Sequence, residues 1–153
     1  MGNRRQFLHT SAGTAVLGLA ASAGLLPTAA QAAWDKAAFE AKGLADVTKA
    51  LGGAAPVESK DVQLNAPEIA ENGAVVRVGA ASSVPGTTQV AILVEKNPNS
   101  LAALFDVPAG TDANVATNIK MGQSSNVYAL VKAGDKYYYA VKEVKVTLGG
   151  CGG

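Results

Sequence analysis

Residues 126–148 read NVYALVKAGDKYYYAVKEVKVTL, two runs of alternating side chains joined by a turn. Val127, Ala129 and Val131 place apolar side chains on one side of the first run. A period of two indicates a β-strand with one buried face. Gly134-Asp135 is a turn signal between the runs. The stretch therefore predicts two consecutive strands.

The same signals recur upstream and give seven strand candidates in all: Val62–Leu64, Ala74–Gly79, Gln89–Glu95, Leu101–Val107, Val115–Met121, Asn126–Lys132 and Lys136–Leu148. Turn residues separate them at intervals of about 8–12 residues, a spacing typical of an antiparallel β-sandwich. The Cys…Trp…Cys framework of antibody domains is absent from the sequence. We therefore predict an all-β fold, an immunoglobulin-like antiparallel β-sandwich of about seven strands, with the likeness confined to architecture.

An apolar run and a run of three tyrosines within these strands are expected to serve packing rather than ligand binding. The run Val90–Val94 belongs either to the core or to a subunit interface, which periodicity does not separate. Tyr137, Tyr138 and Tyr139 alternate across the last strand, so the outer pair and the middle ring face opposite sides. We expect core and interface roles for these rings rather than a ligand cage.

A short helix is predicted ahead of the sandwich, from Trp34 to Leu51. Asp35 is suited to cap its start, because a side-chain oxygen there accepts a hydrogen bond from the first helical turn. Gly43 weakens the middle and is a point where the helix can split. Gly52-Gly53 ends it.

The first 32 residues have the layout of a secretory signal peptide. Arg4 and Arg5 precede an apolar stretch, Thr14–Leu26, and Ala30-Gln31-Ala32 supplies the small residues of a cleavage site. The paired arginines favour the twin-arginine route. The apolar stretch has 13 residues, fewer than the about 20 that a membrane anchor needs. We therefore predict a signal peptide over 1–32, and a mature protein in the periplasm with no membrane segment.

Composition limits the function of the mature chain. The 153 residues suit one ordinary domain, expected over 33–147, and the formal charge of +1 excludes a nucleic-acid footprint. Removing the signal takes away the only histidine, His9, together with two arginines. The mature chain then has a formal charge of −1, no histidine and a single cysteine, Cys151, so it forms no internal disulfide.

The last six residues, 148–153, read Leu-Gly-Gly-Cys-Gly-Gly. Glycine visits conformations closed to other residues, so a flexible swinging arm is predicted, with its root fixed by the strand before it. Its glycines are Gly149, Gly150, Gly152 and Gly153. Cys151 is the strongest nucleophile of the chain, yet no histidine remains to activate it. A thiol presented without catalytic assistance predicts a covalent carrier, with no catalytic residue of its own.

These residues and motifs make the sequence similar to the SoxY family, the carrier subunits of the periplasmic thiosulfate-oxidising Sox system. The resemblance rests on the arginine pair, on Pro67–Gly73, on the Glu95–Pro98 turn, and above all on Val144–Gly153, which ends in Gly-Gly-Cys-Gly-Gly. The family often has a second proline where this chain has Ser100, and an arginine near Asn118.

The resemblance implies that Cys151 is the attachment point of sulfur intermediates and that the chain forms a heterodimer with a SoxZ-like subunit. It also implies three partner enzymes: a haem-containing enzyme that couples thiosulfate to the cysteine, a manganese-dependent hydrolase that releases sulfate, and, where present, a sulfane dehydrogenase. The carrier itself is expected to bind no metal and no cofactor other than its covalent sulfur cargo.

Two other functions remain open at this point. The terminal Gly152-Gly153 also suits a ubiquitin-like sulfur donor, which carries sulfur as a thiocarboxylate on the last glycine. Alternatively, a structural β-sandwich protein would use Cys151 for an intermolecular disulfide. A cysteine of no function is improbable there, because an exposed free thiol is a liability in an oxidising compartment.

Overall fold

The computed structural model describes residues 35–147, which contain two helices and nine strands. The predicted signal peptide, with Arg4 and Arg5, and the predicted arm, with Cys151 and its four glycines, lie outside the described residues. The helices are α2 (Lys36–Glu40) and α3 (Gly43–Ala50). The strands are β1 (Val57–Glu58), β2 (Val62–Asn65), β3 (Ile69–Ala70), β4 (Val76–Ser82), β5 (Thr87–Val94), β6 (Leu101–Asp106), β7 (Asn114–Ile119), β8 (Ser125–Ala133) and β9 (Lys136–Val146).

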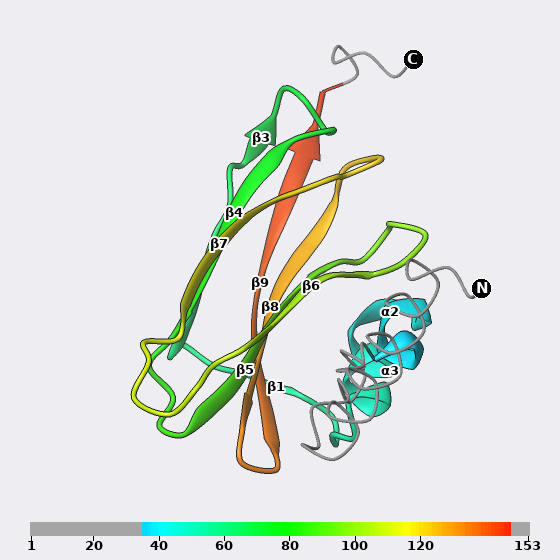
Figure 1. The fold of residues 1–153 in the computed structure, drawn as a ribbon. Coiled ribbons are helices and arrows are strands. Elements are labelled where there is room, and N and C mark those ends of the chain that lie inside the picture. Colours follow the sequence, from blue (N-terminus) through cyan, green and yellow to red (C-terminus); the bar gives the residue numbers. More distant parts are fainter. Residues whose placement is uncertain (1–34, 148–153) are drawn as a thin grey trace, which may run out of the picture. The chain divides into compact units, whose positions relative to one another are not determined.

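The strands form two sheets that pack face to face, which confirms the predicted all-β sandwich. One sheet has the order β1-β9-β8-β5-β6, with β3 also paired to β9, and the other has the order β2-β4-β7. Helices α2 and α3 lie on the side of the larger sheet that faces away from β4 and β7 (Figure 1). Strand β9 pairs with β8 from Lys136 to Val144, so the predicted turn at Gly134-Asp135 closes a β-hairpin.

Seven strands lie where the sequence places them, and two short ones were not foreseen. β1 and β3 have two residues each and pair with β9 in parallel, at Tyr138–Tyr139 and Lys145–Val146. Two residues are too few to show a period, so the sequence pattern cannot reveal them. Strand β4 begins at Val76 rather than at Ala74.

A local turn explains the late start of β4. The Ala74 amide donates to the Asn72 side-chain oxygen at 2.9 Å, and the Val75 amide donates to the Asn72 carbonyl oxygen at 3.3 Å. An asparagine side chain that bonds two residues ahead forms an Asx-turn, which competes with extended structure. The chain therefore turns through 72–75 before the strand starts.

The predicted single helix is two helices. Asp35 caps α2 as predicted, since its Oδ1 accepts from the Ala38 amide at 3.0 Å. The chain is extended at Ala41 and Lys42, and Gly43 then has φ of +77°, a value that favours glycine. The Gly43 amide donates to Ser100 Oγ at 2.8 Å, which fixes the break against the sheet. Gly52, with φ of +82°, ends α3 as predicted.

Residues 90–94 of β5 are buried on both faces of the larger sheet, which explains their continuous apolar run. Val90, Ile92 and Val94 pack between the two sheets. The alternate residues Ala91 and Leu93 pack beneath the helices. Val90–Val94 is therefore core, and the alternative of a subunit interface for this run is wrong.

Tyr137 links the helices to the end of the hairpin, and its hydroxyl gives a stability prediction. The ring is buried with the helix-side cluster, and its hydroxyl donates to the Leu51 carbonyl oxygen at 2.9 Å. Tyr137→Phe leaves that acceptor without its partner, so we expect the free energy of unfolding to fall by about 1 kcal/mol. Urea denaturation measures this. Tyr138→Phe is the matched control, because the Tyr138 hydroxyl makes no hydrogen bond within residues 35–147. Equal losses in both variants would contradict the role of the bond.

Candidate functional site at the end of strand β9

The candidate site is the end of strand β9, the last described part of the chain before Cys151 in the sequence. Thr147 is the last described residue, and it follows directly on β9. β9 is the longest strand, with 11 residues, and its pairing with β8 fixes its direction. The structure thus defines the root of the predicted arm, four residues before the cysteine.

Hydrogen bonds hold this root from two sides. On one side, the Lys145 amide donates to the Glu68 carbonyl oxygen at 2.9 Å, and the Thr147 amide donates to the Ala70 carbonyl oxygen at 3.1 Å. On the other, the Val146 amide donates to Ser124 Oγ at 2.9 Å. Figure 1 shows β3 beside the end of β9. The bonds keep the strand ordered up to its last residues.

Gly73 sits beneath the root in a place that has no room for a side chain. Its carbonyl oxygen accepts from the Met121 amide at 2.7 Å, which ties the β3–β4 loop to the β7–β8 loop. A Cβ on Gly73 would overlap the Met121 carbonyl oxygen and lie 2.9 Å from Val146 Cγ1. The two loops and the strand end therefore meet at this glycine.

The described parts of the motifs that carried the family resemblance lie at or next to this site. The segment Pro67–Gly73 supplies β3 and the glycine beneath Val146. The Glu95–Pro98 turn supports the opposite loop, because Asn97 Nδ2 donates to the Lys120 carbonyl oxygen at 2.7 Å and Asn97 Oδ1 accepts from the Gly122 amide at 3.3 Å. The sequence alone gave no reason for these motifs to occur together. The first segment bonds directly to the end of β9, and the second bonds to the loop whose Ser124 accepts from Val146.

The described residues around the root offer little catalytic chemistry. Within residues 35–147 no group of three or more histidine, cysteine or acidic side chains is placed to hold a metal ion. Farther from the root, burial raises the pKa of Tyr128, and the nearby Glu95 carboxylate raises it further. No helix in the described part of the chain is long and apolar enough to cross a membrane.

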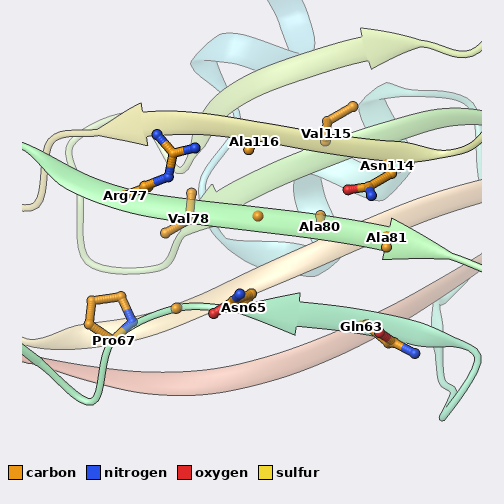
Figure 2. Close-up of a pocket in the computed structure, with 12 residues that line it drawn as sticks. Gln63, Asn65, Pro67, Arg77, Val78, Ala80, Ala81, Asn114, Val115 and Ala116 are labelled. Carbon is orange, nitrogen blue, oxygen red and sulfur yellow. The ribbon is translucent and has the colours of Figure 1, made fainter.

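A shallow depression of about 610 Å³ lies elsewhere, on the outer face of the three-stranded sheet (Figure 2). Its residues come from β2, β4, β7 and the two positions after β2, and most are small or carry amides. The labelled polar ones are Gln63, Asn65, Arg77 and Asn114. Arg77 is the one charged side chain of the lining. Without a nucleophile or an acid–base pair, the depression does not suit catalysis.

Comparison with known families decides the assignment of the chain. A family model described as "Sulfur oxidation protein SoxY" matches residues 47–151. The match covers more than half of the chain and ends at the cysteine. This chain belongs to the SoxY family.

Solved structures agree with membership of the SoxY family. The sulfur carrier protein SoxY from Chlorobium limicola f thiosulfatophilum is 42% identical, with a TM-score of 0.62, and the match covers 67% of this chain and 94% of that one. A superoxide reductase (neelaredoxin) from Ignicoccus hospitalis is 18% identical, with a TM-score of 0.50, and the match covers 59% of this chain and 82% of that one. That likeness shows only a shared fold. None of the curated proteins matches the chain.

Proposed function

We propose that this protein is an exported sulfur carrier that holds sulfur intermediates covalently on Cys151 and presents them to partner enzymes. The observation that carries the proposal is the SoxY-family match, which extends through the sandwich to residue 151. The similar structure from Chlorobium limicola is itself a sulfur carrier protein. The hydrogen bonds that hold the end of β9 support the same function, because a carrier needs a fixed point from which its tether starts.

The proposed chemistry takes place at one sulfur atom. A haem-containing partner joins the Cys151 thiol to the outer sulfur of thiosulfate, forming an S–S bond, releasing a proton and accepting two electrons. A manganese-dependent hydrolase then adds water to the terminal sulfonate. Sulfate and protons leave, and a persulfide remains on Cys151. Where a sulfane dehydrogenase is present, it oxidises this remaining sulfur.

The proposal assigns the chemical steps to partner enzymes because the mature chain has no histidine that could activate the thiol. No histidine follows His9 in the sequence, so no imidazole activates the thiol from within. The proposal therefore gives the carrier no catalytic residue, metal or bound cofactor, and assigns every chemical step to a partner. The flexibility expected of Gly149, Gly150, Gly152 and Gly153 stays a prediction.

Export and a partner subunit belong to the same proposal. The twin-arginine pathway carries folded proteins, so a SoxZ-like subunit without its own signal can leave the cytoplasm with this chain. We expect the protein purified from a periplasmic extract to begin at Ala33 and to elute with a second subunit in equal amount. N-terminal sequencing and size-exclusion chromatography check both. A chain found in the cytoplasm with its first residues intact would contradict the export proposal.

Intact mass spectrometry tests the proposed function. Protein isolated from cells grown on thiosulfate should carry added masses that match sulfane sulfur or a thiosulfonate, whereas protein from cells grown without reduced sulfur compounds should not. Treatment with a thiol reductant should remove these additions, because they are held by S–S bonds. Protein of unmodified mass under both conditions would count against carriage.

A further inference from the structure

The length of the tether determines where a partner enzyme has to dock, an argument that rests on the proposed function. Cys151 is four residues beyond Thr147. Four extended residues span at most about 14 Å. A reacting group in a partner must therefore come within about this distance of the end of β9, and closer contact is needed if that group lies inside a channel. The partner must cover the described surface around Thr147.

Two exposed apolar side chains lie on that surface. Within residues 35–147 the large apolar side chains that remain exposed are Val57, Ile69, Val75 and Val141. Ile69 and Val75 are each 58% exposed, and both belong to the segment 68–75 that holds the root. Ile69 pairs with Lys145, two residues before Thr147. Val75 is two residues from Gly73, which lies beneath Val146.

A third residue of similar exposure, Val57, lies far from the end of β9. Val57 is 61% exposed and pairs with Tyr138, nine residues before Thr147. At about 3.3 Å for each strand residue, that distance is about 30 Å, roughly twice the reach of the tether. A partner that receives Cys151 can cover Ile69 and Val75 without approaching Val57.

The charged side chains around this surface are of both signs. Glu68 and Glu71 flank β3, whereas Lys145 on β9 and Lys120 on the opposite loop are also exposed. A mixed rim gives orientation rather than affinity, and apolar contact supplies the binding energy at the centre of an interface.

We propose that Ile69 and Val75 form the docking surface for the haem-containing enzyme that couples thiosulfate to Cys151. The partner surface that fits them is an apolar rim around the channel that admits the tether. The carrier has to leave this enzyme after loading, so that the next enzyme can act on Cys151. A small apolar contact suits such encounters, since small interfaces bind weakly and release quickly.

Transfer kinetics with surface variants test this docking surface. The measurement is thiosulfate-dependent loading of Cys151 by the purified coupling enzyme of the same organism, with the carrier concentration varied from well below KM to saturation. Ile69→Lys and Val75→Lys should each lower kcat/KM about tenfold, mainly through KM, and Ile69→Ala should lower it about threefold, since burying a lysine head group costs more than losing methyl groups. Val57→Lys is the matched control and should load at the wild-type rate.

Two further readouts separate docking from other effects. Alkylation of Cys151 by iodoacetamide should be equally fast in all four variants, since the small reagent needs no docking. Wild-type rates for Ile69→Lys and Val75→Lys, or an equal loss for Val57→Lys, would overturn the docking proposal and leave carriage intact. Absence of loading in the wild-type protein would overturn the proposed function and the docking surface with it.

Discussion

Cys151→Ser should reduce thiosulfate-dependent sulfur loading to background. A serine hydroxyl forms no S–S bond, so the variant offers no atom on which thiosulfate can be coupled. The loss should appear in a reconstituted system as absent electron release from thiosulfate, and in intact mass as absent adducts. The fold should be unaffected, because Cys151 follows the last strand of the sandwich in the sequence and the chain has no second cysteine for it to pair with. Thermal unfolding at the wild-type temperature is the control.

The same experiment separates the two alternative functions. A ubiquitin-like donor would lose its cargo on deletion of Gly153 and keep it in Cys151→Ser, because its sulfur resides on the terminal carboxylate. A structural protein would form a stable covalent dimer through Cys151 and show no sulfur adducts in any variant. Loading that persists in Cys151→Ser would exclude the proposed attachment point.

Gly73→Ala should destabilise the domain by about 1–3 kcal/mol, the usual cost of forcing extra volume into a packed site. The new Cβ would overlap the Met121 carbonyl oxygen and press on Val146, and neither belongs to the end of a flexible side chain that swings away cheaply. The loops that hold the root must therefore shift. Urea denaturation measures the loss. Hydrogen exchange should also show faster exchange of the Lys145 and Thr147 amides, which bond to the same segment.

Gly122→Ala is the matched control for this prediction. Gly122 lies in the neighbouring loop, its amide bonds to Asn97, and a Cβ there would meet nothing within 4 Å. The free energy of unfolding of Gly122→Ala should stay within about 0.5 kcal/mol of the wild-type value, as is usual for substitutions on a protein surface. Wild-type stability in Gly73→Ala, or an equal loss in both variants, would refute the close packing beneath the root.

The sequence predicts the sandwich because its strands alternate strongly enough to be recognised one at a time. The hairpin of β8 and β9 follows directly from the alternation of Val127, Ala129 and Val131 and the turn at Gly134-Asp135. The tyrosine run behaves as expected: Tyr137 and Tyr139 face the helices, and Tyr138 faces the other sheet. These features are local, so single-sequence patterns are sufficient for them.

What the sequence does not predict are contacts between segments distant in the chain. β1 and β3 exist only as partners of β9, and no period marks them. Lys145 is exposed, whereas Lys142 is half-buried and donates to the Ala66 carbonyl oxygen at 2.7 Å, a bond that alternation along the strand does not predict. The steric need for glycine at position 73 is apparent only from the structure, which places the Met121 carbonyl oxygen and Val146 beside it. The assignment of Cys151 rests on its glycine neighbours in the sequence, and it stays a prediction.

Peptide mapping tests the central claim most directly. Cleavage after Lys145 with trypsin releases residues 146–153, which contain the single cysteine of the chain. In protein from thiosulfate-grown cells, fragmentation of this peptide should place the added sulfur on Cys151, and reduction should remove it. Added sulfur on any other residue, or an unmodified terminal peptide in protein whose intact mass is increased, would contradict the account.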